Sequence, residues 1–216
     1  SVEKFGVVLE RYVQEEMPKR FSTEHSYLSY INNHIRPKWG ECSLTEVKPL
    51  AVRDWLRGLK DKKGRRPLAS KTRGHIKGLM HRIFDCAMVW EYLPPDRNPM
   101  SLVRIEGTTK RRQKPRILTP KEFGNLMTEL KREPCRTMVI LAPCTGVRCS
   151  ELVALRWSDV DWANLSVHVR RAMVSGRLDD VKTEYSQAPV PMDPALAEVI
   201  LDWRRKTEFR SDSDFL

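Results

Sequence analysis

Residues 145–162, TGVRCSELVALRWSDVDW, carry the most informative pattern in the chain. A Thr-Gly turn leads into Arg148, and Ser150 is then expected to cap a helix whose first turn contains Glu151. This pattern places a guanidinium group beside a helix N-terminus, and both favour an anion such as phosphate. The alternative is a surface ion pair between Arg148 and Glu151, which are three residues apart.

The stretch resembles the first arginine box of the tyrosine recombinases, the phage integrase family. In that family the box runs Thr-Gly, an apolar residue, Arg, one variable residue, a small residue, Glu and Leu, and it ends near Leu-x-Trp-x-Asp-apolar-Asp. All of these elements are present here, at Thr145, Gly146, Val147, Arg148, Ser150, Glu151, Leu152, Leu155, Trp157, Asp159, Val160 and Asp161. So long a match is more specific than a three-residue motif, and the resemblance extends over nearly the whole chain.

The resemblance implies a mainly α fold with a small β-sheet, an α+β class. Residues 68–99 resemble the end of the helical core-binding domain of phage integrases. The implied organisation is a helical core-binding, DNA-binding domain in residues 1–106, a basic linker in residues 107–118, and the N-terminal half of a truncated catalytic domain in residues 119–216.

The resemblance also implies covalent phosphoryl transfer, in which a tyrosine hydroxyl attacks a DNA phosphodiester and forms a 3′-phosphotyrosine. Arg148 would stabilise charge on the phosphate, and Glu151 would orient Arg148 through a charge-assisted hydrogen bond. Lys182 resembles the family's hairpin lysine, which acts as the general acid for the leaving 5′-oxygen. The alternative for Lys182 is a solvated surface lysine. Neither a metal nor another cofactor is expected.

Further parts of the family's catalytic machinery follow the position of Leu216: a His-x-x-Arg box, a later His or Trp, and the nucleophilic Tyr. The tyrosines present lie outside the nucleophile position; they are Tyr12, Tyr27, Tyr30, Tyr92 and Tyr185. We therefore expect a fragment that is inactive alone, from a parent that is a site-specific DNA recombinase. The alternatives are a non-catalytic DNA-binding protein or truncated regulator, and a basic helical protein that binds RNA or another protein.

The net charge of +11 points to a polyanionic partner. Residues 60–77 hold eight Lys or Arg and one Asp, and such a segment can neutralise several phosphates. The alternative is a solvated face with a flexible loop. The predicted DNA-binding residues are Lys60, Lys62, Lys63, Arg65, Arg66, Lys71, Arg73, Lys77, Lys110, Arg111 and Arg112. The expected partner is double-stranded DNA, with a homo-tetramer on DNA for the parent enzyme, a monomer when free, and no membrane.

The five cysteines are odd in number and lack Cys-x-x-Cys spacing, which argues against a disulfide framework or a zinc site. No apolar run approaches the roughly 18 residues that a bilayer-spanning helix needs. The expected location is the cytoplasm, for a bacterial or phage-encoded, nucleoid-associated protein.

Hydrophobic periodicity and capping patterns predict the secondary structure. Ser70 is expected to cap the helix of residues 71–90, and Thr119 with Glu122 forms a capping box. His75 and His81 lie on the first of these helices, where they either touch DNA or are ordinary buried or solvated helix histidines. The other expected helices are residues 5–17, 22–35, 44–59, 136–142 and 194–205, and the expected strands include residues 165–169 and 188–192, with a turn at Ser175 and Gly176.

Overall fold

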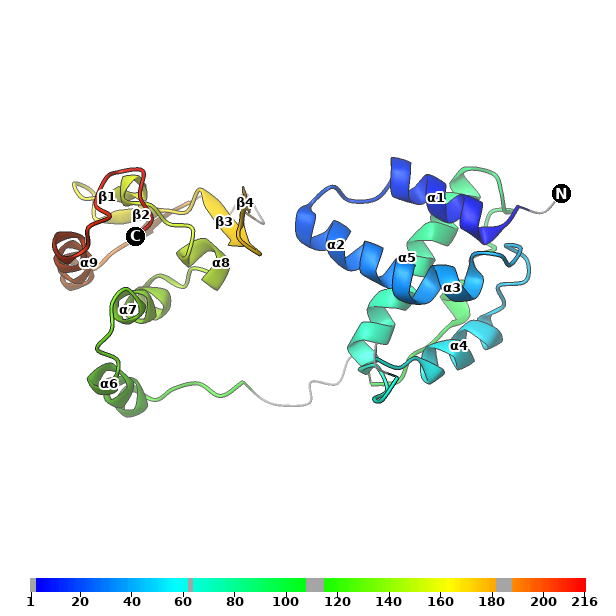
Figure 1. Ribbon diagram of the computed structural model, residues 1–216, viewed down its shortest axis with the longest axis horizontal. Coiled ribbons are helices and arrows are strands. Elements are labelled where there is room, and N and C mark those ends of the chain that lie inside the picture. Colours follow the sequence, from blue (N-terminus) through cyan, green and yellow to red (C-terminus); the bar gives the residue numbers. More distant parts are fainter. Residues whose placement is uncertain (1–2, 62–63, 108–114, 182–187) are drawn as a thin grey trace. The chain divides into compact units, whose positions relative to one another are not determined.

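The structure, a computed structural model, describes residues 3–61, 64–107, 115–181 and 188–216. The chain divides into two compact units, unit 1 (Ser1–Lys114) and unit 2 (Pro115–Leu216), which Figure 1 shows as ribbons. The described part of unit 1 is helical, whereas unit 2 combines helices with short antiparallel strands. The predicted α+β class is therefore confirmed. No described helix is long and apolar enough to span a membrane.

Unit 1 is built around one long helix. Its elements are α1 (Phe5–Glu15), α2 (Phe21–Tyr30), a π-helical turn η1 (Ile31–Ile35), α3 (Arg36–Trp39), α4 (Pro49–Gly58), α5 (Ser70–Val89) and a 3₁₀ turn η2 (Pro99–Leu102). Two predicted helix starts were wrong. The helix expected from residue 44 begins at Pro49, a residue suited to the first helical turn. Ser70 is the first residue of α5 and Ala69 occupies the N-cap position, while the Ser70 hydroxyl accepts a hydrogen bond from Arg73 Nη2 (3.1 Å).

The apolar face of α5 supplies much of the core of unit 1. Phe84 stacks on Phe5 of α1 with ring centroids 5.2 Å apart, and burying each such side chain contributes roughly 1.5–3 kcal/mol. Tyr12 is buried in the same cluster, and loss of solvent around its hydroxyl raises its pKa to about 12. Helices α1 and α3 approach closely at Gly6, where a Cβ atom would lie 2.7 Å from the carbonyl oxygen of Gly40. A larger residue at position 6 would separate the two helices.

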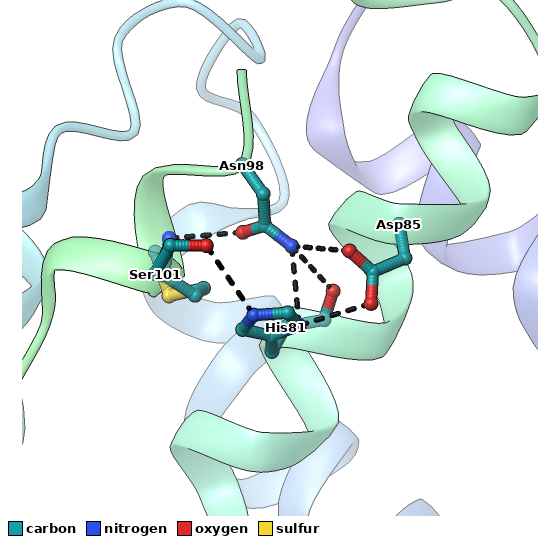
Figure 2. Close-up of polar contacts among 5 residues, drawn as sticks. His81, Asp85, Asn98 and Ser101 are labelled. Atoms are coloured by element: carbon teal, nitrogen blue, oxygen red, sulfur yellow. Dashed lines mark hydrogen bonds and ion pairs between the residues drawn. The ribbon is translucent and has the colours of Figure 1, made fainter. Parts of the chain in front are cut away.

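A polar clamp fastens η2 to α5 (Figure 2). Buried Asn98 donates from Nδ2 to the carbonyl of His81 (3.0 Å) and to Asp85 Oδ1 (2.6 Å), while its Oδ1 accepts from the Met100 amide (2.9 Å). His81 Nδ1 lies 2.9 Å from Asp85 Oδ2, and its Nε2 lies 3.4 Å from Ser101 Oγ. His81 therefore serves the structure of unit 1, whereas His75 is exposed.

Unit 2 places two small antiparallel sheets among four helices of the described chain. Its elements are α6 (Pro120–Glu129), α7 (Cys135–Thr145), α8 (Cys149–Leu152), a 3₁₀ turn η3 (Trp157–Asp159), β1 (Val160–Asp161), β2 (Ser166–His168), β3 (Arg171–Val174), β4 (Arg177–Asp180), β5 (Pro189–Pro191) and α9 (Pro194–Lys206). The first sheet has the order β1-β2-β5, and β3 pairs with β4 in the second. The expected turn at Ser175 and Gly176 joins β3 to β4, and both residues have positive φ.

Local signals set the ends of several helices in unit 2. Thr119 and Glu122 form the predicted capping box at α6, and the hydrogen bond from the Thr119 amide holds the pKa of Glu122 below its usual value. Trp157 is buried between α9 and the C-terminal segment and donates from Nε1 to the carbonyl of Phe209 (2.7 Å). The core of this unit also contains Leu141, Leu152, Leu155, Val160, Val167, Met192, Leu196, Ile200 and Leu216.

Candidate functional site

Arg148 lies in the short connection between α7 and α8. Gly146 ends α7 in the left-handed conformation (φ 67°), and its amide bonds the carbonyl of Ala142 (2.9 Å). This sharp stop lets the chain leave α7 and begin α8 after three residues, Gly146 to Arg148. Arg148 itself occupies the N-cap position of α8, with extended backbone angles.

The predicted capping role of Ser150 was wrong. Ser150 lies inside α8, and Glu151 supplies the polar contact that fixes the start of the helix: its Oε2 accepts from the Arg148 amide (2.9 Å). The same carboxylate binds the Arg148 side chain, with Nη1 2.7 Å from Oε1. Since α8 is a single turn of four residues, its dipole adds little to anion binding. The affinity for an anion at this place must come chiefly from the guanidinium group.

The two partners of this ion pair differ sharply in exposure. The Glu151 side chain is 5% exposed, whereas 53% of the Arg148 side chain remains exposed. A buried carboxylate is costly unless it is paired and hydrogen-bonded, and Glu151 satisfies both oxygens through Arg148. The i,i+3 ion pair is thus present, but it is anchored from inside the protein and holds the guanidinium at the surface.

A second buried carboxylate lies close by in the chain, at Asp159. Its side chain is fully buried and forms a bidentate pair with Arg171 of β3, at 2.7 and 3.2 Å. Asp159 Oδ2 also accepts from the Arg156 amide (2.8 Å), and Arg170 Nε lies 3.8 Å from Oδ1. The pair fixes β3 against η3. The hairpin of β3 and β4, which leads toward Lys182, is therefore tied to the arginine box.

Several predicted site residues lie outside the described residues, so the structure gives no geometry for them: Lys182 of the catalytic set, and Lys62, Lys63, Lys110, Arg111 and Arg112 of the DNA-binding set. Of the described members, Lys60, Arg65, Arg66 and Lys71 are exposed, while Arg73 and Lys77 are half-buried. All of these lie in unit 1, whereas Arg148 and Glu151 lie in unit 2.

Asp61 is the one acidic residue among residues 60–77. It bonds backbone groups of the turn that contains Arg65 and Arg66, called the basic turn below. Its amide bonds the carbonyl of Arg66 (2.8 Å), and its Oδ1 accepts from the Arg65 amide (2.9 Å). Gly64 adopts positive φ (67°) at the tip. The acid thus shapes a turn that presents Arg65 and Arg66 to solvent.

Residues 116–216 match the sequence model of the phage integrase family, and relatives that are integrases match most of the chain. Residues 116–216 are therefore a phage integrase family domain, the family of the tyrosine recombinases. The chain is 28% identical over 205 residues to the integrase of Mycobacterium phage L5, and the match covers 90% of this chain and 52% of that protein. It is 25% identical over 184 residues to the ICEBs1 integrase of Bacillus subtilis, covering 82% of this chain and 48% of that protein. The chain spans about half the length of these curated relatives.

Solved integrase structures share the fold of this chain. A Tn1549 transposon integrase in complex with circular intermediate DNA aligns with a TM-score of 0.78 at 17% identity, covering 95% of this chain and 66% of that chain. A lambda integrase tetramer bound to a Holliday junction aligns with a TM-score of 0.66 at 18% identity, covering 97% and 58%. At these identities the likeness concerns the fold.

Sequence reasoning overlooked Arg171, which no local motif marks. Its partner Asp159 belongs to the Trp-x-Asp part of the integrase box. The only sequence signal for this ion pair was therefore the motif aspartate, which stands among apolar residues that are expected to be buried. The five cysteines are free in the structure.

Proposed function

We propose that the chain is part of a site-specific DNA recombinase, with unit 1 as the core-binding domain, residues 107–118 as the linker, and unit 2 as the N-terminal half of the catalytic domain. The observation that carries the proposal is the exposed Arg148 guanidinium held by buried Glu151 inside a complete family box. A rigidly held planar cation is suited to the non-bridging oxygens of a phosphodiester.

In the proposed reaction, a tyrosine hydroxyl attacks the scissile phosphate, giving a 3′-phosphotyrosine and a free 5′-hydroxyl. Arg148 stabilises the negative charge that develops on the phosphoryl oxygens, Glu151 orients Arg148, and Lys182 protonates the leaving 5′-oxygen. The phosphotyrosine retains the energy of the broken bond, so a second 5′-hydroxyl can reverse the attack and rejoin DNA.

The proposed partner is double-stranded DNA, with four recombinase protomers on the DNA in the parent enzyme and a monomer when free. The two solved structures above support the DNA partner and the tetramer, since one is an integrase on circular intermediate DNA and the other a tetramer on a Holliday junction. The basic turn of unit 1 and the charge of the chain fit the same partner. Action on DNA within a bacterial cell places the protein at the nucleoid.

Trapping of a covalent intermediate tests the proposed chemistry. A full-length protein that contains these residues is expected to form a denaturation-resistant adduct with a nicked suicide duplex, and peptide mass spectrometry should find the DNA 3′-phosphate on a tyrosine. The 216-residue chain is expected to form none, because its five tyrosines lie outside the nucleophile position that the family resemblance implies. An adduct on another residue type, or on this chain alone, would contradict the proposed reaction.

The basic turn supplies a second test, on binding. Replacing Lys62, Lys63, Arg65 and Arg66 by glutamine is expected to flatten the dependence of log K on log salt by about 0.9 for each phosphate that these side chains neutralise. The measurement is duplex affinity at several salt concentrations. A slope equal to that of the unsubstituted chain would assign these residues to a solvated face.

A further inference from the structure

Four arginines line one cavity of unit 1. The cavity has a volume of about 300 Å³ and lies between α4, the start of α5, and residues 104–107. Its arginines are Arg53 and Arg57 from α4, Arg73 from α5, and Arg104. Glu106 is the single acidic residue among those that line the cavity. The positive charges around the cavity repel each other, and an anion bound between them would offset this repulsion.

The protein's own carboxylates offset this charge weakly. Arg57 Nη2 lies 3.6 Å from Glu106 Oε1, and both side chains are largely exposed, at 57% and 94%, so the pair contributes little. Arg53 bonds its chain neighbour Asp54 (3.2 Å), which is also mostly exposed. Within the described part of the chain, Arg104 has neither a hydrogen bond nor an ion pair.

Arg73 gives the clearest sign of a missing acceptor. Its Nη2 donates to Ser70 Oγ (3.1 Å), yet its Nε is buried and finds no hydrogen-bond partner among the described residues. A buried guanidinium donor without an acceptor is unfavourable, and such groups call for an explanation.

The N-terminal end of α5 adds to the positive charge around the cavity. The helix is 20 residues long, no side chain caps its N-terminus, and its first turn holds no acidic residue. The N-terminal end of such a helix carries partial positive charge and favours an anion. The arginine cluster and the uncapped helix end thus favour the same kind of ligand.

We propose that this cavity binds a phosphate group. Arginine suits phosphate because its donors match two oxygens at once, and four arginines line this one cavity. The source follows from the proposed function, on which this part rests: a backbone phosphate of the bound duplex. Free inorganic phosphate presents the same chemistry and is the second source. Arg53, Arg57 and Arg104 were absent from the DNA-binding residues expected from the sequence.

The experiment compares two double variants that remove equal charge from unit 1. Arg53→Gln with Arg104→Gln removes two cations from the cavity and leaves Arg73 in place. Lys19→Gln with Arg97→Gln removes two exposed cations elsewhere and serves as the control. Thermal melts establish that both fold, and Arg104→Gln alone, at an exposed side chain, repeats the test if the first variant unfolds.

One arm titrates inorganic phosphate and follows the NMR signal of Arg73 Nε–H. We expect a saturable shift in the original chain and the control, and about tenfold weaker binding in the cavity variant. The other arm measures duplex affinity against salt. There the log–log slope of the cavity variant should fall by about 0.9 for each phosphate that it no longer neutralises, while the slope of the control stays unchanged.

A response in the duplex arm identifies a backbone phosphate as the ligand, and a response in the phosphate arm alone identifies the free ion. No response in either arm overturns the proposal. If the original chain fails to bind duplex at all, the proposed recombinase function fails, and the phosphate arm still decides whether the cavity is an anion site.

Discussion

Replacing Arg148 by lysine is expected to lower the rate of DNA cleavage about 100- to 1,000-fold in a full-length protein that contains these residues. Lysine keeps the charge but loses the planar fork that binds two phosphoryl oxygens together. It also loses the geometry that Glu151 imposes, because Glu151 holds Arg148 through both a backbone and a guanidinium contact. The measurement is single-turnover cleavage of one duplex.

Binding must be measured beside cleavage on the same DNA. Duplex affinity is expected to fall much less, because many other cations contact the backbone. Arg132→Lys is the matched control, since Arg132 is an exposed arginine of the same unit outside the integrase box. Cleavage near the original rate, or a parallel fall in binding and cleavage through unfolding, would remove the support for a catalytic Arg148.

Features that depend on neighbours within four residues were predictable only in part. The capping box of Thr119 and Glu122 is fixed by atoms one helical turn apart, so its sequence pattern is sufficient. Serine hydroxyls misled the prediction twice, because a favourable cap residue also has other partners. Ser70 accepts from Arg73, and at α8 the carboxylate of Glu151 bonds the backbone one position before the helix.

Contacts between distant positions were not predictable. Asn98 donates a hydrogen bond to the carbonyl of His81 in α5, 17 residues earlier in the chain. Nothing in the sequence relates these two residues. The strands β3 and β4 read RAMV and RLDD, which lack a regular apolar alternation, so periodicity gave no signal. For the candidate site, the box itself identified Arg148 and Glu151, whereas the burial of one partner and the exposure of the other required the structure.

Asp159→Ala is expected to lower the free energy of unfolding of unit 2 by about 3 kcal/mol, because it leaves Arg171 without its partner in a buried setting. It also removes the acceptor for the Arg156 amide. Urea unfolding followed by tryptophan fluorescence measures the change, since buried Trp157 lies two residues from Asp159.

The matched control is Asp212→Ala, which breaks another Arg–Asp pair of the same 2.7 Å separation, with Arg204. Asp212 is 77% exposed and Asp159 fully buried, so the control should cost less than about 1 kcal/mol. Adding Arg171→Met to Asp159→Ala should recover part of the stability, because it removes the unpaired charge. Equal destabilisation by the two aspartate substitutions would show that burial does not set the value of this pair. In that case contacts other than the Asp159–Arg171 pair would hold the β3–β4 hairpin to the arginine box.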